Sequence, residues 1–121
     1  MRRLLFVDHR FGLRPGTYPL PGTEYLAVVA ENVSMAVDAA RGQKPDLLIL
    51  NPATVGAGQL LAMQETQEIG RSVPVVLYTD DPENSRHFPF GLIEAVVERH
   101  CGVEKLLQTI ERVLEGLPSS I

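Results

Sequence analysis

Asn51 directly follows a strongly apolar stretch, at a position where many proteins have a side chain that takes part in chemistry. Leu47–Leu50 are four aliphatic residues in a row, which is typical of a strand buried on both faces of a parallel sheet. The residue after such a strand lies at the carboxyl edge of the sheet, where open α/β folds bind their ligands. A carboxylate at that place can attack an electrophile or hold a metal cation, whereas an amide is uncharged and is a far poorer nucleophile. Asn51 therefore occupies a functional position without a catalytic side chain.

Five apolar segments predict the sheet that positions Asn51. They are rich in Val, Leu and Ile, and gaps of helical length separate most of them. That spacing predicts an α/β fold with a five-stranded parallel sheet and helices on both faces. The predicted strands are residues 2–8, 24–30, 46–51, 73–79 and 94–99.

Three gaps have helical patterns, at residues 32–43, 58–70 and 102–116. Asn32 is a suitable N-cap for the first helix. The last helix has the clearest 3.6-residue apolar period, and Gly116 suits the position directly after a helix end.

Two gaps do not favour a regular helix. Residues 9–23 contain three prolines, which break a helix, so we expect a proline-rich loop in place of the first helix. In residues 80–92, Pro89 and Gly91 allow at most a short or broken helix.

Composition predicts one globular domain over residues 1–117, followed by a tail or the start of a linker at residues 118–121. The chain has 121 residues, of which 45% are hydrophobic and 21% are charged, with a net charge of −4. This charge argues against nucleic-acid binding by this domain, and no apolar run has the length of a signal peptide or a membrane span. Cys101 is the only cysteine, which favours a reducing compartment, and we expect a cytoplasmic protein.

The order of these segments and several local sequences resemble the receiver domain of bacterial two-component response regulators. "LLFVDH" is similar to the first strand of the family, which normally ends in two acids, and "VPVVLYT" is similar to the fourth strand, which ends in Thr or Ser. "VVAENVSMAVDAARGQKPDLLILN" matches the second and third strands and the helix between them, and "RHCGVEKLLQTI" resembles the Lys-Pro-Phe turn and last helix. The resemblance implies a flavodoxin-like fold with the strand order 2-1-3-4-5.

The resemblance also implies that the phosphorylation site is degenerate. Asn51 lies at the position of the family's phosphoacceptor aspartate, and His9 replaces the second acid of the magnesium site. Asp8 is retained, Thr79 matches the hydroxyl that contacts the phosphoryl group, and Arg99 lies at the position of the lysine. One carboxylate is a weak basis for magnesium, which prefers anionic oxygen ligands. We expect no catalysis, no bound metal and no cofactor.

Further positions depart from the family pattern. Asp80 adds a negative charge beside the phosphate position, and Val96 replaces the aromatic residue that switches conformation. We expect Asp8 to pair with Arg99 as a structural remnant instead of binding a metal ion. Cys101 lies at an apolar family position, and we expect it to pack as a small hydrophobic side chain.

These departures predict a pseudo-receiver that acts as a phosphorylation-independent protein-interaction module in bacterial signalling. Its partner is expected to be another signalling protein or a second copy of the chain. The final helix is one candidate surface, and two aromatic, proline-containing loops are others. The candidate anchors in these loops are Tyr18, Leu20, Phe88 and Phe90.

Two alternatives remain open, and the first is a domain of the same flavodoxin-like fold that binds a small cofactor. "DHRFG" at residues 8–12 is similar to the Asp-x-His-x-x-Gly box of cobalamin-binding domains, but its spacing differs, and no Gly-rich phosphate loop follows any predicted strand. The second alternative is an unorthodox receiver that is phosphorylated at Asp8 or Asp80.

Overall fold

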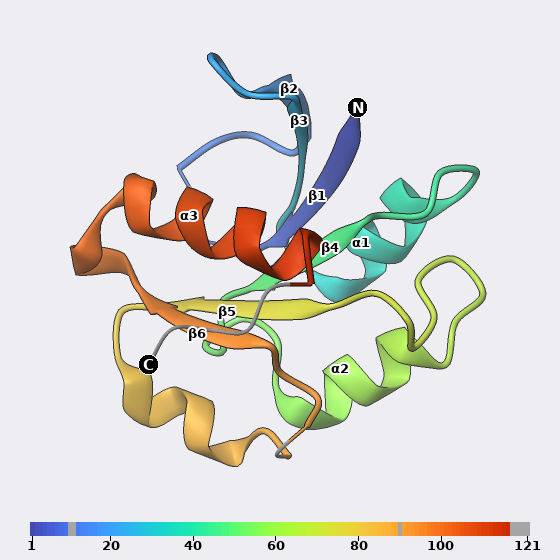
Figure 1. Cartoon of the computed structure of the whole chain (residues 1–121). Helices are drawn as coiled ribbons and strands as arrows, with labels where there is room; N and C mark the ends of the chain where they lie inside the picture. Colours follow the sequence, from blue (N-terminus) through green and yellow to red (C-terminus); the bar gives the residue numbers. More distant parts are fainter. Residues whose placement is uncertain (10–11, 90, 117–121) are drawn as a thin grey trace.

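A six-stranded sheet forms the centre of the computed structural model, which describes residues 1–9, 12–89 and 91–116 (Figure 1). The strands lie in the order β2-β3-β1-β4-β5-β6. Their bounds are β1 Arg2–Val7, β2 Gly16–Pro19, β3 Tyr25–Ala30, β4 Leu47–Leu50, β5 Val75–Thr79 and β6 Ala95–Glu98.

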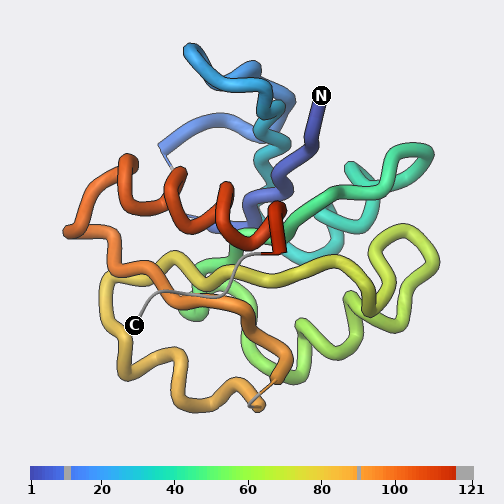
Figure 2. Tube along the Cα trace, viewed as in Figure 1, coloured from blue at the N-terminus to red at the C-terminus, as the bar shows by residue number. Residues whose placement is uncertain are grey.

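The predicted count of five strands is wrong, and the predicted order is incomplete, because the proline-rich segment contributes the additional strand β2. This strand pairs antiparallel with β3 at one edge of the sheet, and Figure 2 shows the two side by side. The remaining five strands are parallel and lie in the order β3-β1-β4-β5-β6. A proline excludes a helix interior, but it is compatible with an edge strand, where Pro19 lies. The segment is therefore not simply a loop.

The three predicted helices are present and are shorter than their sequence patterns. They are α1 (Val33–Ala40), α2 (Ala57–Gln64) and α3 (Val103–Leu114). Asn32 caps α1 as predicted, because its side chain accepts a hydrogen bond of 2.9 Å from the backbone N–H of Met35. Gly116 follows α3 with a φ of 70°, which a glycine adopts without strain.

Two short 3₁₀ helices complete the structure. η1 (Pro82–His87) follows β5, and within the described part of residues 80–92 it is the only helix, as predicted. η2 (Arg99–Cys101) connects β6 to α3. Within the described ranges, no helix is long and apolar enough to cross a membrane.

The sheet separates two apolar cores. Leu5, Val7 and their neighbours on one face pack against α1 and α2, whereas Leu4, Phe6 and their neighbours on the other face pack against α3 (Figure 1). This alternation follows from the strand geometry, in which successive side chains point to opposite faces. The sheet is buried on both sides, so the polar residues that end its strands are held at one rigid edge.

Candidate functional site

Asp8, Asn51 and Arg99 come together at the carboxyl edge of the sheet, directly after β1, β4 and β6. The side-chain N–H of Asn51 donates a hydrogen bond of 3.0 Å to Oδ1 of Asp8. The guanidinium of Arg99 forms an ion pair with Oδ2 of the same carboxylate. Both oxygens of Asp8, which is only 4% exposed, therefore have partners, one from the end of the neighbouring β4 and one from the end of the more distant β6. The predicted pairing of Asp8 with Arg99 is confirmed.

The amide of Asn51 uses both of its ends. While Nδ2 faces Asp8, Oδ1 accepts a hydrogen bond of 2.9 Å from the backbone N–H of Ala53. An amide supplies one donor and one acceptor in this way, whereas a carboxylate has only acceptors. The site is thus built for an asparagine, because an aspartate would place an acceptor oxygen against the Asp8 carboxylate.

Arg99 closes one side of the site. Its side chain is 20% exposed, and its Cζ lies 4.7 Å from the centre of the Tyr78 ring, at a distance typical of a cation–π contact. Burial lowers the pKa of Arg99, but an arginine stays protonated at neutral pH. Asp80 lies farther out, with Oδ1 at 3.8 Å from Nε of Arg99 and 71% of its side chain exposed. The main partner of the cation is therefore Asp8.

The hydroxyl of Thr79 is fully buried and is used within its own turn. It donates a hydrogen bond of 2.8 Å to the backbone carbonyl of Asp81 and accepts one of 3.1 Å from the N–H of the same residue. These two bonds fix the chain as it leaves β5. Thr79 lies at the predicted edge, but its hydroxyl stabilises a turn.

His9 is exposed and contacts the loop after β4. Its backbone N–H donates a hydrogen bond of 3.2 Å to Oγ1 of Thr54, and its Nδ1 forms a hydrogen bond with the same hydroxyl. Which of the two groups donates in the second bond depends on the tautomer of the imidazole, because a hydroxyl can both donate and accept. The imidazole of His9 therefore has a structural contact, and it does not supply the carboxylate oxygen that magnesium prefers as a ligand.

Several other predicted positions differ from expectation. Cys101 is exposed, so the prediction that it packs as a buried hydrophobic side chain is wrong. Phe88 is buried in the core on the α1 and α2 face, so it does not offer an exposed anchor. Tyr18 and Leu20 are half-buried against the core on the α3 face. Phe90 and the tail at residues 118–121 lie outside the described residues.

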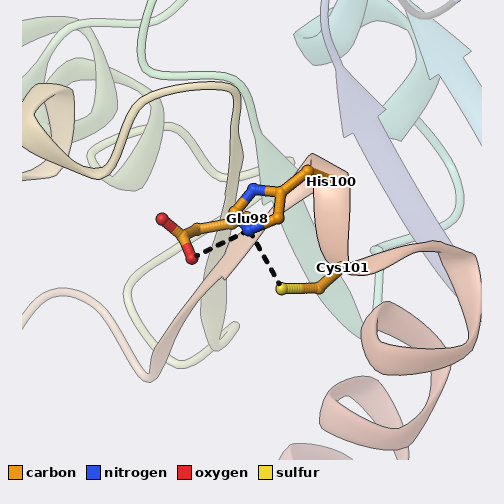
Figure 3. A group of neighbouring side chains, drawn as sticks. All are labelled: Glu98, His100 and Cys101. Atoms are coloured by element: carbon orange, nitrogen blue, oxygen red, sulfur yellow. Dashed lines mark hydrogen bonds and ion pairs between the residues drawn. The ribbon is translucent and has the colours of Figure 1, made fainter.

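One group of residues with metal-ligand side chains was not predicted from the sequence. Glu98, His100 and Cys101 bring a carboxylate, an imidazole and a thiol together at the start of η2 (Figure 3). Arg99, which lies between them in the sequence, instead reaches Asp8. The available signal was the run "ERHC", which has three metal-ligand types in four residues.

The central site has the chemistry of a closed ion pair. One carboxylate is balanced by one guanidinium, and the amide occupies the remaining carboxylate oxygen. Pairing and hydrogen bonding of this kind stabilise a buried charge, and a cation or an electrophile would have to compete with both partners for the carboxylate oxygens.

No protein-family model matches the chain, and no curated protein is significantly similar to it.

Proposed function

We propose that this chain is a pseudo-receiver, a flavodoxin-like domain of the receiver type that binds another protein without being switched by phosphorylation. The observation that carries the proposal is the closed arrangement of Asp8, Asn51 and Arg99. The five parallel strands support the flavodoxin-like assignment, because without the edge strand β2 they lie in the order that the resemblance implies.

Phosphoryl transfer to this edge is disfavoured for two reasons. First, the side chain at the end of β4 is an amide, which is a poor nucleophile for phosphorus. Second, magnesium would have to compete with Arg99 for the Asp8 carboxylate, and the imidazole of His9 is a poor replacement for a second acid. The edge therefore acts as a fixed structural centre, and no phosphorylation-driven shift between two states is available.

Two of the three candidate interaction surfaces, the β2 region and α3, lie on the same face of the molecule. Tyr18 and Leu20 from the β2 region pack against the same core as Leu107 and Leu114 of α3. An open groove of about 730 Å³ lies between the β2–β3 turn and α3. Its lining residues are Met1, Arg2, Gly22, Thr23, Glu24, Tyr25, Leu107, Glu111, Leu114 and Glu115.

The chemistry of this groove indicates the kind of partner. Tyr25, Leu107 and Leu114 supply apolar surface, while Glu24, Glu111 and Glu115 place carboxylates around it. Apolar contacts ringed by charge are typical of protein interfaces, in which the centre supplies affinity and the rim supplies specificity. We propose that a signalling protein with apolar and basic residues, or a second copy of the chain, binds here.

Partner capture and self-association test this function. The wild-type protein is used as bait in a lysate of its host, and its own association is followed by sedimentation velocity, each with and without acetyl phosphate and Mg²⁺. We expect the same partner and the same association constant under both conditions. A change of more than about tenfold, which corresponds to about 1.4 kcal/mol, would overturn phosphorylation independence.

A pair of variants locates the surface. Leu107→Ala combined with Glu111→Ala changes one apolar and one acidic side chain that line the groove, and we expect it to weaken binding at least about tenfold. Leu61→Ala is the matched control, because Leu61 is 43% exposed and belongs to α2, on the other face of the sheet. Circular dichroism verifies that each variant is folded. Equal binding by both folded variants would place the interface elsewhere.

A further inference from the structure

We propose that Glu98, His100 and Cys101 form a binding site for a divalent transition-metal ion, for which Zn²⁺ is the best fit. The site is at the junction of β6 and α3 (Figure 3). It does not depend on the proposed function, because it uses none of the side chains that close the Asp8 centre.

The spacing of the three ligand atoms is close to that of a coordinated ion. Nε2 of His100 lies 3.7 Å from Oε2 of Glu98 and 3.7 Å from Sγ of Cys101, and all three ligand atoms lie within 4.8 Å of one another. Tetrahedral zinc, with its usual bond lengths, holds neighbouring ligand atoms about 3.4–3.6 Å apart. The two separations from the imidazole exceed this spacing by only a few tenths of an ångström. The ligand atoms of Glu98 and Cys101, which lie within 4.8 Å of each other, would move closer together on binding the same ion.

The ligand types select the metal. A thiolate and an imidazole favour Zn²⁺ and neighbouring transition metals over Mg²⁺ and Ca²⁺, which prefer oxygen. The thiolate of Cys101 and the carboxylate of Glu98 together carry the two negative charges that neutralise a dication. A neutral complex is compatible with the cation of Arg99, which lies next in the chain to two of the ligands. Three protein ligands leave a fourth position for water or for a group from a partner.

The backbone places these ligands before any ion binds. Glu98 ends β6 in register with Thr79 of β5, and the backbone N–H of Gly102 donates a hydrogen bond of 3.1 Å to the carbonyl of Arg99. Gly102 has a φ of 87°, a conformation that favours glycine and lets α3 start directly after the turn. Backbone hydrogen bonds hold both ends of this segment, so metal binding needs to order the ligand side chains but not the backbone.

Successive side chains of this turn point to different places, so the ion pair of Arg99 and the proposed metal site use different residues. Arg99 reaches the buried Asp8, while the side chains of Glu98, His100 and Cys101 range from half-buried to exposed and are open to solvent. A bound ion would therefore clamp the same turn that carries Arg99. We expect metal binding to stabilise the protein without displacing the ion pair.

Cobalt and zinc titrations test the site on the full chain, kept reduced with a phosphine. Co²⁺ should bind with one ion per chain and produce the near-ultraviolet charge-transfer absorption of a thiolate–cobalt bond, and Zn²⁺ should displace it. Cys101→Ser should abolish that absorption. His100→Gln and Glu98→Gln should each weaken binding at least about tenfold, because even outer-shell partners of metal ligands have effects of this size.

His87→Gln is the matched control, since His87 is an exposed histidine on η1, outside the cluster. It should bind Co²⁺ as the wild type does. The three ligand positions are solvent-accessible, so their variants are expected to stay folded. The proposal is overturned if wild type and Cys101→Ser bind Co²⁺ equally. It is also overturned if binding requires two chains per ion, because the site would then not be formed by one chain.

Discussion

Asn51 donates its side-chain N–H to Oδ1 of Asp8 at 3.0 Å, so the ends of β4 and β1 are joined by a hydrogen bond between an amide and a carboxylate. The same carboxylate is held from the other side by Arg99. In a site that accepts a phosphoryl group, two carboxylates at these strand ends would repel each other and attract a metal cation. Here the amide replaces that repulsion with an attractive contact.

Asn51→Asp should destabilise the protein. The substitution converts the donor that faces Asp8 into an acceptor that carries a negative charge. We expect a loss of about 1–3 kcal/mol in the free energy of unfolding at pH 7, as for other buried polar groups that lose a partner. The penalty should become smaller as the pH falls toward 4, because one of the two carboxylates then takes up a proton.

Urea unfolding of wild type and Asn51→Asp at both pH values measures this effect. Asn84→Asp is the matched control, because Asn84 is an exposed asparagine on η1. It should change stability by less than about 0.5 kcal/mol, as surface substitutions usually do. Equal stability of Asn51→Asp and wild type at pH 7 would contradict the proposed role of the amide.

Arg99→Met should be more damaging than Arg99→Lys. Methionine leaves the buried Asp8 carboxylate without its cation, and we expect a loss of about 2–4 kcal/mol, somewhat below the usual range for a fully buried pair because Arg99 keeps some contact with solvent. Lysine retains the charge but loses the planar group that stacks on Tyr78. A double-mutant cycle with Asp8→Asn, measured by urea unfolding, isolates the pair. Additive effects in that cycle would show that Asp8 and Arg99 are not coupled.

Thr79→Val should test whether this hydroxyl is structural. Valine has the same shape but removes both hydrogen bonds to the backbone of Asp81, and we expect a loss of about 1–3 kcal/mol in a fully buried position. Thr79→Ser keeps the hydroxyl and removes one methyl group, for which about 0.5–1.5 kcal/mol is typical. Thermal unfolding should therefore rank serine above valine. The reverse order would mean that packing, and not the turn, determines this position.

Tyr78 should make stability sensitive to alkali. Burial raises the pKa of Tyr78 above 10, and the negative charge of Asp80 acts in the same direction. A group whose pKa is higher in the folded than in the unfolded state contributes stability below its unfolded pKa, and this contribution is lost as the pH rises through the folded value. As the pH rises above the ordinary tyrosine pKa of 10, wild type should therefore lose more stability than Tyr78→Phe. Urea unfolding across this pH range measures the difference, and identical curves for wild type and Tyr78→Phe would refute this dependence.

Much of the sheet was predictable from the sequence, because consecutive aliphatic residues specify strands that are buried on both faces. Leu47–Leu50 is the clearest example, since all four residues are buried. β2 was not predicted, because the prolines of this segment exclude a helix but do not by themselves indicate a strand. Its pairing with β3 depends on tertiary contact at an open sheet edge, which local propensity does not report.

The site was predictable only in part. The resemblance placed Asp8, Asn51, Thr79 and Arg99 at one edge, and the parallel sheet confirms that placement. It did not reveal that Thr79 is used by its own turn. The exposure of Cys101 and the burial of Phe88 were also missed, because a turn and a 3₁₀ helix have no apolar period from which burial can be read.

Whether the chain accepts a phosphoryl group tests most directly that Asp8, Asn51 and Arg99 form a closed, phosphorylation-independent centre. Intact-mass spectrometry is performed on wild type after incubation with acetyl phosphate and Mg²⁺. The account predicts no mass change, and it predicts that Asn51→Asp alone does not become efficiently phosphorylated, because His9 and Asp80 still oppose magnesium and phosphate. An acid-labile gain of one phosphoryl group on wild type, abolished by Asp8→Asn or Asp80→Asn, would contradict the account and establish an unorthodox receiver.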